Sequence, residues 1–325
     1  MSRSIHRRTF LTGAAAATVA LAAPRATAAA GPRISTAFTL PDARAYPEGI
    51  ALDPRTGDAY VGSFTTGAIY RAAAGSRAAD VFLPAGADGR TTANGLKADR
   101  AGRLWVIDHT TGIDVYDLRD RSLLARFQVP EGDPRFINDL VIGADGTAYA
   151  TDSVRPVVYR VTPAEVARGG SAPLAAHFDL SGAVPPHAPN AYALNGIVAD
   201  PTGRLLFVVD MTGGGLYRVD VTDGSVRQVT LHGGDLVNGD GLELSHRTLW
   251  AAHNRTNTLT RWHLSPDGTE ARLTRTLTTT DLQIPTTLAH THRGLLVVRS
   301  QFDKGGPMGQ GTPTTPFTVA RVTGM

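Results

Sequence analysis

The chain repeats one pattern of short apolar runs and turns about every 45 residues. Each copy has an apolar run, an Asp-x-x-Gly or similar turn, a second apolar run, a polar loop and a third run. The six copies begin at Gly49, Gly95, Asp139, Gly196, Gly241 and Thr287. Self-similarity at a fixed period of this size is typical of solenoids, propellers and other repeat architectures.

The runs within each copy are rich in Val, Leu, Ile, Tyr and Thr, and Gly- and Asp-containing turns join them, which is typical of antiparallel hairpins. The repeat predicts an all-β fold, a six-bladed β-propeller. A two-sheet sandwich, the alternative, does not account for the near-constant period. Ile34–Leu40 precedes the first copy and Phe317–Val322 completes the sixth. We therefore expect Ile34–Leu40 to be the outer strand of the last blade and to close the ring.

The composition excludes several kinds of site. The 325 residues include no cysteine, which rules out disulfides, zinc–thiolate sites, iron–sulfur clusters and a cysteine nucleophile. Hydrophobic residues make up 42% of the chain and charged residues 19%, enough for one large core and too little charge for a disordered polyelectrolyte. We expect residues 31–325 to form a single domain.

The formal net charge of +3 comes from the N-terminal segment. Four of the 32 basic residues lie within residues 1–30, which contain no Asp or Glu, so 28 basic residues remain against 29 acidic ones. A nucleic-acid-binding protein would need a basic face on the rest of the chain. We therefore expect no nucleic-acid partner.

Residues 1–30 have the pattern of an export signal. A basic stretch that includes Arg7-Arg8 precedes the weakly apolar run Leu11–Ala23, and Ala26–Ala28 offers a small-residue cleavage site. The paired arginines resemble the twin-arginine signal of proteins that are exported already folded. A membrane anchor is the alternative, but the run is shorter than the roughly 20 residues that a membrane span needs. We expect a secreted or periplasmic monomer that meets the twin-arginine export machinery and has no stable membrane insertion.

A polar or charged residue stands just before the first run of each copy. These residues are Glu48, Asn94, Asn138, Asn195, Asp240 and Thr286. In a propeller the first strand of each blade is innermost, so we expect these side chains to meet around the central channel. Carboxylate and amide oxygens are ligands for a hard divalent cation, and Ca²⁺ suits them best. The alternative is that Asn and Asp beside Gly are turn residues only, but their recurrence at one repeat position favours a metal site.

The end of the second run in each copy returns to the same face, because neighbouring strands of a blade are antiparallel. The residues there are Ser63-Phe64, Asp108-His109, Asp152-Ser153, Asp210-Met211, His253-Asn254 and Arg299-Ser300. We expect them to surround the mouth of the channel, with His109 and His253 near the metal as candidate bases. The predicted substrate contacts are Asn94, Asn138, Asp108 and Arg299.

The longest step between copies contains an insertion before Asn195 that includes residues 184–194. It enters the same face, so it is predicted to be a lid over the site or an inert surface loop. The Gly- and Pro-rich stretch Gly305–Pro316 is expected to border the same mouth.

Several of these motifs resemble those of the SMP-30/gluconolactonase/LRE-like family. The similar segments are Pro47-Glu48-Gly49, Phe136-Ile137-Asn138-Asp139, Leu194-Asn195-Gly196 and Asp240-Gly241-Leu242. The resemblance covers nearly all of residues 31–325 and implies a six-bladed propeller, related to paraoxonase-type and strictosidine synthase-like proteins, that holds a divalent metal. Carried over, the ligands are Glu48, Asn195 and Asp240, and Asn138 contacts metal or substrate. Phe136 departs from the family, which often has Arg at this position.

Together these features predict a metal-dependent hydrolase of a lactone or related small ester. The metal polarises the carbonyl and activates water, and Asp240 is the general base. The sequence has no G-x-S-x-G, H-E-x-x-H or Walker motif. Two other functions remain open: a non-catalytic propeller that binds a small molecule, and a biosynthetic enzyme that cyclises or condenses its substrate in the same pocket.

Overall fold

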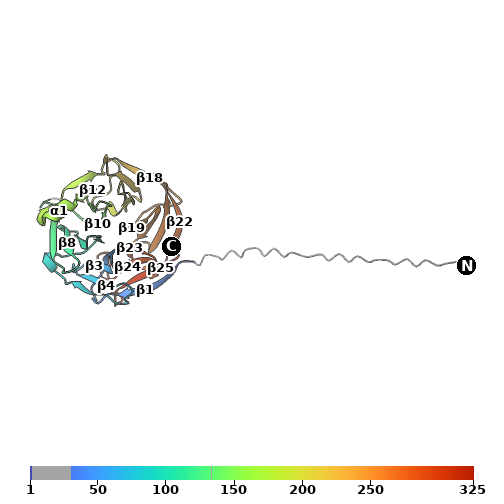
Figure 1. Ribbon diagram of the computed structural model, residues 1–325, viewed down its shortest axis with the longest axis horizontal. Helices are drawn as coiled ribbons and strands as arrows, with labels where there is room; N and C mark the ends of the chain where they lie inside the picture. The colour runs from blue at the N-terminus through green and yellow to red at the C-terminus, as the bar shows by residue number, and fades with distance from the viewer. Residues whose placement is uncertain (2–30, 133) are drawn as a thin grey trace. The chain divides into compact units, whose positions relative to one another are not determined.

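Short strands separated by turns make up most of the described chain (Figure 1). The computed structural model describes residues 1, 31–132 and 134–325. Residues 2–30, which hold most of the predicted export signal, lie outside the described residues. Within the described ranges no helix has the length and apolar character needed to cross a membrane. The predicted all-β class is confirmed, and Pro32–Met325 form one propeller-like unit.

In the described part of the chain the strands form five sheets. The first sheet contains β2 (Pro47–Leu52), β3 (Ala59–Ser63), β4 (Ile69–Ala72) and β5 (Asp80–Leu83). The second contains β6 (Leu96–Ala98), β7 (Arg103–Asp108), β8 (Gly112–Asp117) and β9 (Leu123–Gln128), with β13 (Gly170–Pro173) parallel to β9. The third contains β10 (Ile137–Ile142), β11 (Ala148–Asp152), β12 (Val157–Val161) and β14 (Ala176–Asp179).

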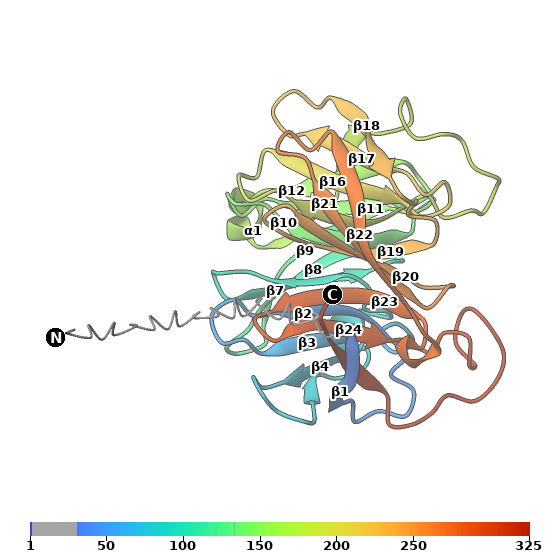
Figure 2. The ribbon, with the colours of Figure 1, turned by 90° about the vertical axis from the view of Figure 1, so that its right-hand side faces the viewer.

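The fourth sheet has eight strands in two halves. One half is β15 (Leu194–Ala199), β16 (Leu205–Asp210), β17 (Leu216–Asp220) and β18 (Val226–His232). The other is β19 (Gly239–Ser245), β20 (Thr248–His253), β21 (Thr258–Leu264) and β22 (Glu270–Thr278). The halves are joined where β18 runs parallel to β22 over Thr230–His232, and Figure 2 views the molecule from the side on which Figure 1 shows these two strands.

The fifth sheet contains β23 (Pro285–Thr291), β24 (Gly294–Arg299), β25 (Thr318–Thr323) and β1 (Arg33–Thr39). Its outer strand β1 pairs antiparallel with β25, so the first and last strands of the described chain lie side by side. The α-helix of the described residues, α1 (Pro163–Arg168), begins with a capping box between Thr162 and Glu165. The 3₁₀ helices are η1 (Ala87–Gly89) and η2 (Thr280–Leu282).

The innermost strands contact one another around the centre of the ring. The contacts run from β2 to β6, β10, β15, β19 and β23, and from β23 back to β2 (Figure 1). Glycine permits this close approach, because a Cβ on Gly49 would lie 2.0 Å from the carbonyl oxygen of Asn94, and one on Gly196 2.4 Å from that of Asp240. The close approach of the inner strands explains why their polar residues are so often followed by Gly.

The hydrophobic core lies between neighbouring sheets. One cluster, for example, packs Tyr60 and Phe82 of the first sheet against Leu104 and Tyr116 of the second. Burial of aromatic rings in such layers is a large part of propeller stability. Since the apolar side chains fill the spaces between sheets, the inner strands are free to present polar side chains to the centre.

Candidate active site

The inner strands carry their polar residues at β-bulges. In β2 the register passes from Pro47 opposite Ser63 to Ile50 opposite Val61, so β2 has one residue more than β3 at Glu48-Gly49. The same shift occurs in four other inner strands, at Asn138, Asn195, Asp240 and Thr286. A bulge removes a residue from the ladder and re-aims its side chain. The repeated polar residues are thus turned out of the regular sheet at the same end of each inner strand.

Three of these residues interact with one another. Asp240 is 5% exposed, and the Asn254 amide donates a hydrogen bond of 2.7 Å to its Oδ2. The Asn195 side chain lies near enough to lower the pKa of the Asp240 carboxyl, and its amide donates to Met211 Sδ over 3.2 Å. Glu48 is close enough for its carboxyl to be repelled by that of Asp240. Residues from β2, β15 and β19, far apart in the sequence, therefore meet in one place.

Burial has the largest effect on the pKa values of the carboxyl groups at this site. It raises the pKa of Glu48 well above its ordinary value, and repulsion by Asp240 and Asp139 raises it further. Burial also raises the pKa of Asp240 to about 7, although the hydrogen bond from Asn254 and the nearby Asn195 side chain lower it. The pKa of Asp139 is raised by burial and lowered by Lys97. Ionised carboxylates in this setting would be stabilised by a positive charge among them.

Three buried oxygens in this group have no hydrogen-bond partner: Glu48 Oε2, Asn138 Oδ1 and Asp139 Oδ2. Leaving such an oxygen unpaired costs free energy that a cation would recover. No group of three His, Cys, Asp or Glu side chains within the described residues is arranged to hold a metal by itself. A cation here would need amide oxygens as well, and Ca²⁺ accepts that mixture of donors.

Asp139 was not assigned a role by the sequence. It lies on β10 directly after Asn138, is 4% exposed, and its Oδ1 accepts a hydrogen bond from the Leu140 N–H over 2.8 Å. The corresponding residue in four other copies is Gly49, Gly95, Gly196 or Gly241. A carboxyl in place of a glycine at a close-packed position is the signal that would have identified it.

His109 lies at the mouth beside the inner residues. Its Nδ1 is 3.3 Å from Oδ1 of Asn94, and its ring is stacked between Phe64 and Phe136, with ring centroids 5.2 and 4.4 Å away. Burial lowers the pKa of His109, and the nearby Asp108 opposes that shift. A histidine with a lowered pKa is neutral near pH 7 and can accept a proton.

His253 and Arg299, both predicted near the mouth, make hydrogen bonds within the fold. His253 is buried with Nδ1 2.9 Å from the Val237 carbonyl oxygen and Nε2 2.8 Å from Thr260 Oγ1, so both ring nitrogens have partners. The Arg299 guanidinium donates to Thr36 and Thr318 on the outer strands β1 and β25. Both ring nitrogens of His253 and Nη1 of Arg299 thus have partners within the fold, whereas Nε of Arg299 is buried with no hydrogen-bond partner among the described residues.

Asp108, which the sequence predicts as a substrate contact, has a structural role in this structure. Its carboxylate accepts hydrogen bonds from the backbone and side chains of Thr91, Thr92 and Thr110. These bonds lower its pKa against the effect of burial, which raises it. Asp108 therefore organises the loop that carries His109.

The insertion before β15 is anchored over the same end of the ring. His187 Nε2 lies 2.8 Å from Asp210 Oδ1, and Thr212 Oγ1 donates a hydrogen bond of 2.6 Å to the Tyr192 carbonyl oxygen. The Tyr192 ring packs on Phe136, with centroids 4.8 Å apart. The loop thus lies at the mouth, as the lid interpretation requires.

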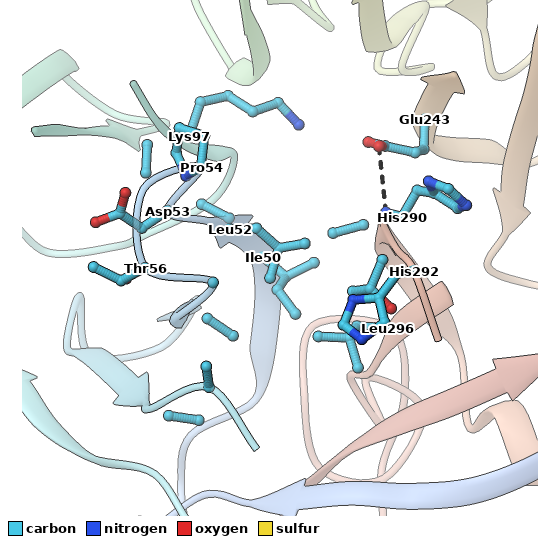
Figure 3. Close-up of a pocket in the computed structure, with 18 of the residues that line it drawn as sticks. Ile50, Leu52, Asp53, Pro54, Thr56, Lys97, Glu243, His290, His292 and Leu296 are labelled. Atoms are coloured by element: carbon cyan, nitrogen blue, oxygen red, sulfur yellow. Dashed lines mark hydrogen bonds between the residues drawn. The ribbon is translucent and has the colours of Figure 1, made fainter. Parts of the chain in front are cut away.

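A cavity of about 740 Å³ lies at the other end of the inner strands (Figure 3). Lys97 and Glu243 point into it, and the His290 N–H donates to the Glu243 carboxyl over 3.3 Å. None of the six inner polar residues lines this cavity. Size alone would favour it as the reaction site, but the buried unpartnered oxygens are at the bulged end, so we assign the chemistry there.

Known proteins share this fold. Among solved structures, a gluconolactonase from Xanthomonas campestris is 17% identical, with a TM-score of 0.62 over 90% of this chain and 89% of that one. The allergen Mala s 1 of Malassezia sympodialis is 15% identical, with a TM-score of 0.61 over 86% and 93%. An aldose sugar dehydrogenase from Streptomyces coelicolor, bound to PQQ, is 15% identical, with a TM-score of 0.57 over 90% and 98%.

At these identities the solved structures show a shared fold and leave the reaction open. None of the curated proteins matches the sequence. The model of the SMP-30/Gluconolactonase/LRE-like region, however, matches residues 46–294, well over half of the chain. This protein therefore belongs to the SMP-30/gluconolactonase/LRE-like family.

Proposed function

We propose that the protein hydrolyses a lactone or a related small ester at the bulged end of the inner strands. Water adds to the carbonyl carbon and the acyl C–O bond breaks, so that an ester gives a carboxylic acid and an alcohol and a lactone gives a single hydroxy acid. The observation that carries the proposal is the group of buried, unpartnered oxygens on Glu48, Asn138 and Asp139. Family membership supports the same class of reaction.

We propose that the site binds a divalent cation, Ca²⁺ by its donor set, through Glu48, Asn138, Asn195 and Asp240, with Asp139 alongside them. When bound, such a cation polarises a carbonyl and lowers the pKa of water. Asn254 fixes the orientation of Asp240, which we assign as the general base. His109, neutral at pH 7 and 3.3 Å from Asn94, is the second group able to take a proton.

We propose that the eight-stranded sheet is two blades, which makes the ring a six-bladed propeller closed by β1. Both halves begin with an inner strand that carries the same bulge, at Asn195 and at Asp240. The parallel contact between β18 and β22 involves three residue pairs at the outer edge. The pairing of β1 with β25 then joins the two ends of the chain.

We also propose that residues 1–30 direct export of the folded protein through the twin-arginine route. The paired Arg7-Arg8 carries this proposal. The variant Arg7→Lys/Arg8→Lys should remain in the cytoplasm when the wild-type chain reaches the periplasm or the medium. Equal export of both would contradict it.

The experiment that tests the hydrolase is metal analysis followed by turnover of a panel of lactones and esters. Purified protein should contain about one Ca²⁺ per chain, and a chelator should reduce turnover at least 100-fold, reversibly. Glu48→Gln and Asp240→Asn should have the same effect, whereas Asp80→Asn, on the exposed edge of β5, should not. Activity that survives the chelator would contradict the proposal, and Ca²⁺ binding without any turnover would favour the non-catalytic binding protein.

A further inference from the structure

Five ring side chains form a continuous row at the bulged end of the ring. We call this row the aromatic arc; its members are Phe302, Phe64, His109, Phe136 and Tyr192. Successive ring centroids are 5.2, 5.2, 4.4 and 4.8 Å apart. Because each ring comes from the next sheet or loop around the ring, the arc follows the edge of the mouth.

The arc is attached directly to the candidate site. His109 contacts Asn94, and the Ser153 N–H donates to the Phe136 carbonyl oxygen over 2.9 Å. The side chain of Ser153 in turn accepts a hydrogen bond of 2.8 Å from the Asn138 amide. The backbone of Phe136 is therefore tied to the Asn138 side chain through Ser153.

One end of the arc is not used by the hydrophobic core. Phe302 belongs to a core cluster and Phe64 packs against it. Phe136 and Tyr192 belong to none of the core clusters formed by the described residues. Tyr192 is 43% exposed, yet its backbone is fixed by Thr212. An exposed aromatic ring on an anchored loop is a binding surface that is already organised.

Two arginines at this end of the ring, Arg135 and Arg299, donate hydrogen bonds to other parts of the fold. Arg135 donates to the carbonyl oxygens of Thr110 and Pro130, and Arg299 donates to the outer strands. A polyhydroxylated lactone needs a polar partner for each hydroxyl that it buries, and the arc supplies ring surface in that place. Flat apolar groups, in contrast, gain from stacking on aromatic rings.

We propose that the substrate carries a flat apolar group, an aryl ring on the lactone or ester, and that Phe136 and Tyr192 select it. This inference rests on the proposed function, since it describes the substrate of the same site. It makes the protein an aryl-lactone or aryl-ester hydrolase that discriminates against sugar lactones. The specificity comes from the loop before β15 and from the residue two positions before Asn138.

The test compares γ-phenyl-γ-butyrolactone with γ-methyl-γ-butyrolactone, which have the same ring and the same class of leaving group. The wild-type protein should prefer the phenyl compound by at least about tenfold in kcat/KM and should turn over D-glucono-1,5-lactone more slowly than either. Tyr192→Ala and Phe136→Ala should reduce the phenyl preference to about twofold or less. Tyr192→Phe should retain it, as should Val81→Ala, a change at an exposed position on β5.

A second measurement tests ligand binding at the aromatic arc independently of hydrolysis. The lactams 5-phenyl-2-pyrrolidinone and 5-methyl-2-pyrrolidinone resist hydrolysis and report binding alone by calorimetry. If the protein binds the phenyl lactam selectively and Tyr192→Ala abolishes this selectivity, the aromatic arc is supported. Absence of turnover of every lactone would overturn the hydrolase but not the arc. Turnover with no phenyl preference, or a preference that Tyr192→Ala leaves intact, would overturn the arc and leave the hydrolase standing.

Discussion

The Asn254 side chain donates a hydrogen bond of 2.7 Å to Oδ2 of Asp240 and thereby ties the end of β20 to the bulge in β19. The backbone of Arg255 donates to Oδ1 of Asn254, so the amide itself is held in one orientation. Groups that hold a candidate ligand in this way usually affect metal affinity nearly as much as the ligand does.

Asn254→Ala should therefore weaken Ca²⁺ binding and lower kcat/KM by about 10- to 100-fold. The Asp240 carboxyl would lose the donor that favours its ionised form and fixes its direction. Calorimetric titration with Ca²⁺ measures the first effect and lactone turnover the second. Thr256→Ala, an exposed change in the same turn, is the control, and equal affinity in both variants would contradict this role.

The metal-free protein should become less stable as the pH rises. The pKa of Asp240 is raised from its ordinary 3.8 to about 7, so the folded chain keeps a proton that the unfolded chain releases in this window. The free energy of unfolding is therefore highest below about pH 4, falls as the pH rises toward 7, and stays lower above pH 7. Glu48 contributes in the same direction.

Urea unfolding between pH 5 and pH 8 in the presence of a chelator checks this dependence. Asp240→Asn should weaken the pH dependence, because the amide does not titrate and only the Glu48 contribution remains, and added Ca²⁺ should reverse it, because the cation binds the ionised carboxylates. A metal-free protein that gains stability between pH 5 and pH 8 would contradict the assignment of the buried carboxyls.

Gly196→Ala should damage both the fold and the site. Its new Cβ would lie 2.4 Å from the Asp240 carbonyl oxygen and 2.7 Å from the Leu242 nitrogen, so β15 and β19 would have to separate. Overpacking of this kind costs about 1–3 kcal/mol, and the shift would also move Asn195 away from Asp240. Urea unfolding and Ca²⁺ titration measure the two effects.

Gly182→Ala is the matched control, since an added Cβ there meets no atom within 4 Å. It should leave unfolding and Ca²⁺ binding unchanged. If Gly196→Ala behaved in the same way, the close approach of the inner strands would not position the site.

Much of this architecture follows from the repeat in the sequence. The period predicts short antiparallel strands with one recurring polar position, and the structure places Glu48, Asn195 and Asp240 at equivalent bulges of three inner strands. Periodicity works here because each copy has the same neighbours on both sides, so local pattern and global fold agree.

Side-chain direction was less predictable. Arg299 follows the repeat pattern, yet its long side chain reaches Thr36 and Thr318, which only the tertiary structure brings near. Position in a repeat fixes the backbone and leaves the χ angles of a long side chain to its surroundings. The stacking of Tyr192 on Phe136 was unpredictable for the same reason, because it depends on how the insertion before β15 folds back.

Lys97 offers a charge-based test of the site. Its ammonium lowers the pKa values of Glu48 and Asp139 from its position on β6, so it stabilises their ionised forms and repels a cation bound among them. Lys97→Met should tighten Ca²⁺ binding by at least about tenfold when measured at pH 8.5, where protons compete weakly for the carboxylates. The metal-free variant should be less stable than the wild-type protein, because the buried carboxylates lose their compensating charge.

The sequence supplies a matched control, since Lys304 is its other lysine. Lys304→Met removes the same charge from the loop after β24 and should leave Ca²⁺ affinity within about twofold of wild type, because nearby solvent screens it. Calcium titrations of the two variants at low and high salt separate a local effect from a change in net charge. Equal affinities in the two variants would mean that no cation binds within reach of Lys97, and the metal site would then have to lie elsewhere than among Glu48, Asp139 and Asp240.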